Sequence, residues 1–200
     1  MKIYNHLNTN GLSNTYVVVN ERNHEAIIID PGQISERIIE QIEVNSLKFT
    51  TVLITHNHKN HVEGLTTMMK IYSPNIYAAD WEIEGNETIV LNGDGKIRLA
   101  GMTVHYMTLP GHTADSMIYK IGNILFTGDT IGAGRIGSTN SSYSSHILKR
   151  NINEKILSQQ ESTVIMPGHG PPTSVGAEKL YNKDLEGIVY NNLHQPMKYF

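Results

Sequence analysis

The chain has 200 residues, enough for one domain with a well-buried core, and its 39% hydrophobic and 18% charged residues are typical of soluble globular proteins. A formal net charge of −3, with no cluster of lysine or arginine, argues against a nucleic-acid partner. The absence of cysteine excludes a disulfide framework, a thiolate nucleophile and a cysteine-ligated zinc site. We find no signal-peptide segment and no apolar run of membrane-spanning length, so we expect a cytoplasmic protein without a membrane partner.

Hydrophobic periodicity divides the first half of the chain into strands and helices. β-branched runs interrupted by turn residues predict strands, and isoleucines at helical spacing predict a helix. In chain order we expect a hairpin of 16–19 and 26–29, a helix starting near Gln33 or Ser35, a strand over 51–54 and a helix over 62–72.

The second half repeats this order. We expect hairpins of 97–99 with 102–108 and of 116–120 with 124–127, then a helix over 147–157, a strand over 163–166 and a last helix over 181–191. The polar run 138–145 is either a lid or a solvated loop. Strands alternating with helices predict two packed sheets with helices outside, in a single domain over 1–200 with two pseudo-symmetric halves that meet near 85–95.

Four polar clusters each follow an apolar strand, where loops carry functional residues. They centre on H-x-H-x-N-H at residues 56–61 and on His112, Asp129 and His169, each of the last three beside glycine. Loops at one end of neighbouring strands converge, so these side chains are expected to meet. Five imidazoles and a carboxylate suit zinc, which takes about four ligands, and Asp129 is able to bridge two metals.

These residues, in this order, resemble the metallo-β-lactamase superfamily, whose pattern is H-x-H-x-D-H, a later His, a bridging Asp and a final His. The resemblance runs from about residue 14 to residue 181. Asp30-Pro31-Gly32 and the sequences around His112, Asp129 and His169 look most like the small glyoxalase II-like branch, the hydroxyacylglutathione hydrolases. The resemblance implies an α/β fold, a four-layer αββα sandwich with the metal site at one edge of both sheets.

The resemblance also assigns the ligands. The first metal would be held by His56, His58 and His112, and the second by His61 and His169, with Asp129 bridging both. The metal would be zinc, as one or two ions, with iron or manganese as alternatives. Asp30 would orient a ligand histidine; read without the resemblance, it is equally a turn residue before Pro31.

Asn60 departs from the family pattern, which has Asp at this position. An amide is neutral, coordinates more weakly than a carboxylate and cannot act as a general base. Three explanations stay open: the site holds one metal or a weak second one, the chain has lost or altered its activity, or Asn60 was introduced to trap an inactive state.

The resemblance implies a hydrolase acting on a small-molecule thioester or ester, including those derived from glutathione. A hydroxide on the metal would attack the carbonyl, with Asn60 orienting it and Asp129 bridging the metals. Arg135 and Tyr143, after Asp129, are either substrate contacts or ordinary exposed residues. The alternatives are a mononuclear-iron persulfide dioxygenase that uses His56, His112 and Asp129, and a degenerate metal-binding member weakened by Asn60.

Overall fold

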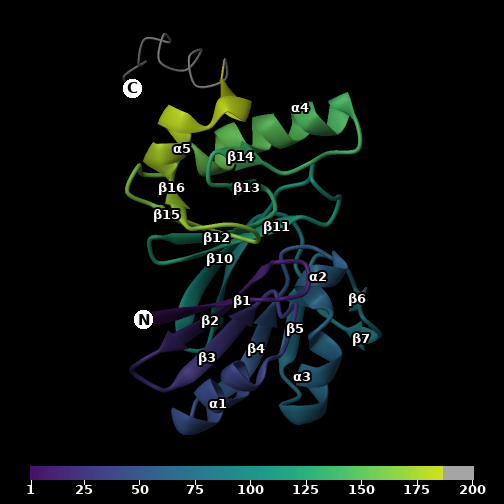
Figure 1. The fold of residues 1–200 in the computed structure, drawn as a ribbon, viewed down its shortest axis with the longest axis vertical. Helices are drawn as coiled ribbons and strands as arrows, with labels where there is room; N and C mark the ends of the chain where they lie inside the picture. The colour runs from purple at the N-terminus through teal and green to yellow at the C-terminus, as the bar shows by residue number, and fades with distance from the viewer. Residues whose placement is uncertain (187–200) are drawn as a thin grey trace.

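The computed structural model describes residues 1–186 and shows two six-stranded sheets packed together (Figure 1). The first sheet has the order β1 (Lys2–Leu7), β2 (Asn14–Asn20), β3 (Glu25–Ile29), β4 (Lys48–Leu53), β5 (Asn75–Ala78), β8 (Ile89–Val90). The second has the order β16 (Thr173–Ser174), β15 (Val164–Pro167), β12 (Ile124–Gly128), β11 (Met117–Ile121), β10 (Met102–Thr108), β9 (Gly95–Leu99). Two short hairpins pair β6 (Glu82–Ile83) with β7 (Asn86–Glu87), and β13 (Ile131–Gly132) with β14 (Arg135–Ile136).

The central strands read as continuous apolar runs because both of their faces are buried. Alternate residues of β2 enter two different cores: Val17 packs beneath the helices of the first half, and Val18 packs between the sheets. Tyr16 and Phe126, one from each sheet, meet edge to face with ring centroids 5.3 Å apart. The hydrophobic core between the sheets therefore joins the two halves of the chain.

Helices cover the outer face of each sheet (Figure 1). The helices are α1 (Glu36–Val44), α2 (Lys59–Val62) and α3 (Leu65–Ile71) in the first half, and α4 (Ser142–Asn151), the π-helical η1 (Ile152–Ile156), α5 (Val175–Tyr181) and the 3₁₀ turn η2 (Lys183–Leu185) in the second. The layers are helix, sheet, sheet and helix, so the predicted αββα sandwich is confirmed. Among residues 1–186, the structure has no helix that is both long and apolar enough to cross a membrane.

Three helix predictions need correction. The helix expected over 62–72 begins earlier and is broken, because the Gly64 N–H donates to the Pro31 carbonyl, where a side chain would collide. The helix expected over 147–157 begins at Ser142, since Ser141 caps it, so the second part of the run 138–145 is helical. Among residues 1–186 the last α-helix is α5, which ends at Tyr181 where we expected a helix to begin. Only the 3₁₀ turn η2 follows it within the predicted range, and residues 187–191 lie outside the described part.

The direction of the strands places the site. β12 and β15 are parallel, and two antiparallel pairings make β10 run in the same direction as β12. Their carboxyl ends therefore lie at one edge, next to the end of β4. The chain passes from the first sheet to the second between Val90 and Gly95. The division of one domain into two pseudo-symmetric halves stays a prediction.

Candidate metal centre

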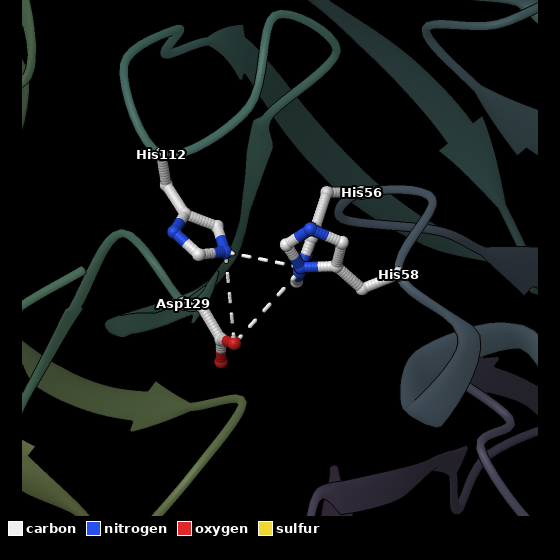
Figure 2. Close-up of side chains that lie close together, drawn as sticks. All are labelled: His56, His58, His112 and Asp129. Carbon is white, nitrogen blue, oxygen red and sulfur yellow. Dashed lines mark hydrogen bonds and ion pairs between the residues drawn. The ribbon is translucent and has the colours of Figure 1, made fainter. Parts of the chain in front are cut away.

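Four predicted side chains converge at this edge, one after β10, one after β12 and two after β4 (Figure 2). His56 Nε2 lies 2.9 Å from His58 Nδ1, and His112 Nε2 lies 3.2 Å from the same atom. Asp129 Oδ2 is 3.8 Å from Nε2 of both His56 and His112. We call His56, His58, His112 and Asp129 the first group; one ligand atom from each lies within 4.8 Å of the others.

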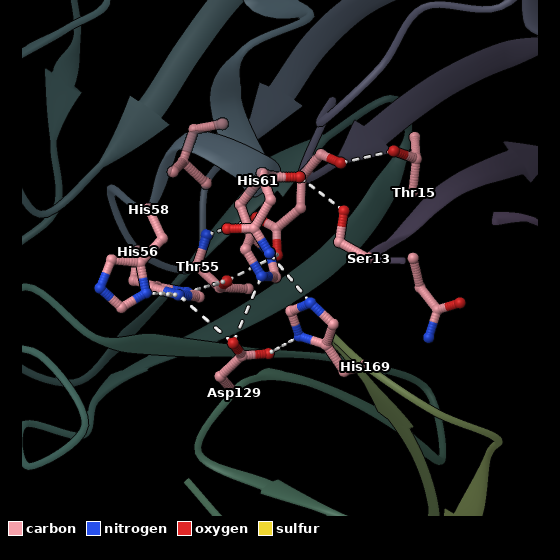
Figure 3. A network of polar contacts seen from close by, with 12 residues as sticks. Ser13, Thr15, Thr55, His56, His58, His61, Asp129 and His169 are labelled. Atoms are coloured by element: carbon pink, nitrogen blue, oxygen red, sulfur yellow. Dashed lines mark hydrogen bonds and ion pairs between the residues drawn. The ribbon is translucent and has the colours of Figure 1, made fainter. Parts of the chain in front are cut away.

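The other two predicted histidines share Asp129 with the first group and form the second group (Figure 3). His61 Nε2 lies 3.5 Å from Asp129 Oδ2, and His169 Nδ1 lies 2.7 Å from Asp129 Oδ1. His61 comes from α2 and His169 follows β15, so the second group joins segments about 110 residues apart. The structure thus brings together all six residues predicted as ligands.

A buried hydrogen-bond network orients two of the imidazoles. Asp30 directly follows β3 with φ 51°, and its Oδ2 lies 3.0 Å from His61 Nδ1. The Thr55 hydroxyl donates to the same carboxylate at 2.6 Å and lies 3.1 Å from His56 Nδ1. Because Nδ1 of both rings is occupied, their Nε2 atoms face the centre. This is the orienting contact expected of Asp30 under the resemblance, and such contacts fix the tautomer of a ligand histidine.

Burial and neighbouring charges set the protonation of the site without metal. Burial lowers the pKa of His56 to about 3 and also lowers the pKa of His58, which keeps both rings neutral. Burial opposes protonation of His61, yet the facing carboxylates of Asp129 and Asp30 raise its pKa to about 9. For Asp129, burial favours the neutral form, but the hydrogen bond from His169 and the nearby His61 ring outweigh it and hold the pKa well below its usual range.

The donor set fits a divalent metal. His61 Nε2 is fully buried, has no hydrogen-bond partner and points at Asp129, and orphaned buried polar atoms are rare. Gly168 makes room for this approach, because a Cβ there would lie 2.4 Å from Asp129 Oδ1 and 2.5 Å from His61 Cε1. Neutral imidazoles around one carboxylate are ligands that zinc and iron both accept.

Comparison with known proteins agrees with this geometry. Residues 8–84 match the family model of the metallo-β-lactamase superfamily. An uncharacterised protein of Mycobacterium tuberculosis is 31% identical over 209 residues, covering 88% of this chain and 93% of that protein. The chain belongs to the metallo-β-lactamase superfamily.

Other relatives in the superfamily carry more specific names. A probable zinc-dependent hydrolase of polyketide biosynthesis from Bacillus velezensis is 26% identical, with 90% of this chain and 80% of that protein covered. A hydroxyacylglutathione hydrolase of Buchnera aphidicola is 35% identical over 130 residues, covering 63% of this chain and 51% of that enzyme.

Solved structures of the superfamily share the fold. The BLEG-1 B3 metallo-β-lactamase superposes with a TM-score of 0.81 at 25% identity, over 93% of this chain and all of that one. ETHE1 from Myxococcus xanthus superposes with a TM-score of 0.80 at 21% identity, over 98% of this chain and 93% of that one.

Asn60, where the superfamily pattern has Asp, lies beside the second group. Its Nδ2 is 2.9 Å from His169 Nε2, and the Gly11 carbonyl oxygen is 3.0 Å from the same ring nitrogen. The Asn60 carbonyl accepts from the Ser13 hydroxyl at 2.5 Å, so the loop between β1 and β2 holds the residue in place. The amide therefore contacts a ligand of the second group and supplies no negative charge to it.

A pocket of about 320 Å³ opens next to the ligands. It is lined by His112, Asp129 and His169, and by Arg135 on the β13–β14 hairpin. Arg135 has no ion-pair partner among residues 1–186. Tyr143, the other residue considered as a substrate contact, is 74% exposed on α4 and does not line this pocket.

The sequence analysis did not predict three contacts that support the ligand histidines. Thr55 holds both Asp30 and His56, and its place directly before the histidine motif was a usable signal. The carbonyls of Gly11 and Ser138 contact His169 and His112, at 3.0 and 2.8 Å. Because every residue has a carbonyl, no sequence pattern marks these two.

Proposed function

We propose that the chain is a metal-dependent hydrolase of thioester or related ester bonds in small molecules. The observation that carries the proposal is the convergence of two ligand groups on Asp129, which lines the same pocket as an arginine without an ion-pair partner among residues 1–186. The zinc-dependent hydrolase and the hydroxyacylglutathione hydrolase among the relatives support this reaction class.

In this proposal the first group holds the principal metal, and zinc is the ion we expect. A bound zinc ion would bring the pKa of a water molecule to about 7 and polarise the substrate carbonyl. Asp129 supplies the one carboxylate of the group and stays ionised, which offsets part of the charge of the ion. Asn60 is placed to donate a hydrogen bond toward the second group, but it cannot take up a proton.

The pocket favours substrates with an anionic end. Arg135 presents an unpaired guanidinium, the side chain best suited to bind a carboxylate with two hydrogen bonds. His112, His169 and Asp129 line the same pocket as Arg135, so a carbonyl placed beside these ligands would leave the anionic end near Arg135. Glutathione thioesters, whose thiol half carries carboxylates, have this layout.

Thiol release from a hydroxyacylglutathione tests the proposal directly. The chain has no cysteine, so a thiol-reactive dye reports only product. We expect zinc-dependent release that chelation abolishes and that His112→Ala lowers by at least about a hundredfold, as expected when a metal ligand is lost. His146→Ala, an exposed histidine on α4, serves as the control. Failure of the zinc-loaded protein to hydrolyse any thioester or ester probe would overturn the proposal.

One observation favours a second candidate, an iron-dependent persulfide dioxygenase. His56, His112 and Asp129 form a set of two imidazoles and a carboxylate, the set that mononuclear iron uses in oxygenases. Asn60 would matter little there, because one metal is enough. Sulfite formed from glutathione persulfide and oxygen by iron-loaded protein, without thioester hydrolysis, would select this function. Absence of both activities would select a degenerate metal-binding member.

A further inference from the structure

The hairpin that carries Arg135 is too short to hold its own shape. β13 and β14 have two residues each, paired as Ile131 with Ile136 and Gly132 with Arg135. The turn between the strands consists of Ala133 and Gly134. Tight two-residue turns of hairpins favour a positive φ at the first turn residue, but here only the second, Gly134, has one, at 76°. The turn therefore does not have a geometry that favours hairpin formation. Isolated two-stranded hairpins are marginal even when longer. Contacts from outside must therefore fix this one.

Those contacts come from α5 and η2, on both sides of the arginine. The Gly134 N–H lies 3.2 and 3.1 Å from the two carboxylate oxygens of Glu178. The Ile136 N–H donates to Asp184 Oδ2 at 3.1 Å. The two backbone donors that flank Arg135 are thus both bound by carboxylates of the same segment.

Glu178 is unusual because it is buried without a cation. Glu178 is only 2% exposed, and no Lys, Arg or His forms an ion pair with its carboxylate among residues 1–186. Thr173 and Asn182 donate to it, each at 2.6 Å, and Asn182 in turn accepts from the Asp184 N–H at 3.1 Å. A buried carboxylate is costly unless its oxygens are hydrogen-bonded. Here the bonds it makes join α5 and η2 to the pocket wall.

We propose that Glu178 is a positioning residue for substrate specificity, which sets where Arg135 lies in the pocket by holding the hairpin. It does not itself touch the substrate. The α5–η2 segment is thereby a rigid support for a loop whose own strands cannot supply rigidity. The functional half of this inference rests on the proposed function; the structural half does not.

Amide hydrogen exchange tests the structural half without any substrate. Glu178→Gln keeps the shape of the side chain but leaves one acceptor oxygen for three donors. We expect exchange at Gly134 to quicken by about tenfold, as the loss of one ordinary hydrogen bond implies, with metal content unchanged. The matched control is Glu161→Gln. The Glu161 side chain is 75% exposed and pairs with Lys179, which lies on α5 next to Glu178. Unchanged exchange in folded Glu178→Gln would overturn the inference.

Steady-state kinetics tests the functional half. With an anionic thioester we expect KM to rise by about tenfold while kcat stays within about threefold, because Arg135 binds substrate without taking part in bond cleavage. A merely structural defect would lower kcat and metal content together, and that result would overturn the inference. If Glu178→Gln does not fold, Asp184→Ala, which removes the side-chain acceptor of the Ile136 N–H, must quicken exchange at that amide. If neither the native protein nor any variant hydrolyses a thioester, the proposed function fails. The exchange data still decide whether Glu178 holds the β13–β14 hairpin in place.

Discussion

Replacement of Asn60 by aspartate is predicted to convert a one-metal centre into a two-metal centre. In the native chain the second group has one carboxylate, Asp129, which it shares with the first group. The amide of Asn60 lies 2.9 Å from His169 Nε2, so a carboxylate in its place would face the same ligands. The change adds one negative charge and one strong ligand where a second dication would bind.

The size of the effect follows from Coulomb's law. A carboxylate about 4 Å from a dication, at an effective dielectric constant of about 20, gains about 8 kcal/mol of Coulomb energy, and desolvation of the carboxylate offsets about half of this, which leaves about 4 kcal/mol. Since each 1.4 kcal/mol is a factor of ten, the Kd of the second metal is expected to fall by about three orders of magnitude. The native chain should therefore keep about one zinc per chain at free zinc concentrations that fill both sites of Asn60→Asp.

Metal content, measured by mass spectrometry after dialysis against buffers of graded free zinc, checks this prediction. Asn57→Asp is the matched control, because it makes the same change of charge three residues before Asn60, at an exposed residue outside both groups. Two tightly held zinc ions in the native chain, or one in Asn60→Asp at every zinc level, would refute the reasoning.

Three further predictions concern the same site. Gly168→Ala should lose most of its metal, because the new methyl group collides with Asp129 and His61. Gly132→Ala is the control and should keep its metal, since no atom lies nearer than 3.4 Å to the added Cβ. Metal content after dialysis separates the two variants. In metal-free protein, the raised pKa of His61 adds up to about 3 kcal/mol to the free energy of unfolding. This contribution is full below pH ~6.5 and is lost as pH rises through about 9. Because the metal-free protein thus becomes less stable, the gain in Tm on adding zinc should grow from pH 7 to pH 9. A constant gain would contradict that account. Arg135→Gln should raise KM by about tenfold for anionic thioesters and leave it unchanged for neutral ones, as parallel kinetics with both probes would show.

The sequence predicted the central strands and the ligands for different physical reasons. Strands buried on both faces must be apolar throughout, so β3 and β4 were visible as runs. β1 was missed because it is an edge strand with an exposed and polar pattern. The break before α3 was also hidden, since it depends on a hydrogen bond from Gly64 to Pro31, 33 positions away. Local patterns do not report such tertiary contacts.

At the site, the ligand set was predictable because metal chemistry restricts the residue type at each position. The effect of Asn60 was not, because a neutral amide is compatible with several arrangements until its neighbours are known. The role of Glu178 also needed the structure. A glutamate at helical spacing reads as an exposed residue, and only its burial beneath the β13–β14 hairpin reveals its hydrogen bonds.

The ligands come from both sheets, and a bound ion would therefore act as a cross-link in a chain without cysteine. His56 and Asp129 of the first group are 73 residues apart, so an ion held by both would close a long loop and restrict the unfolded chain as a disulfide does. Ser13, the residue before β2, already joins the two halves through an isolated bridge to His169. Unlike a disulfide, such a link depends on the free metal concentration and not on redox state. Resistance of this protein to unfolding and proteolysis is thus expected to follow the supply of metal.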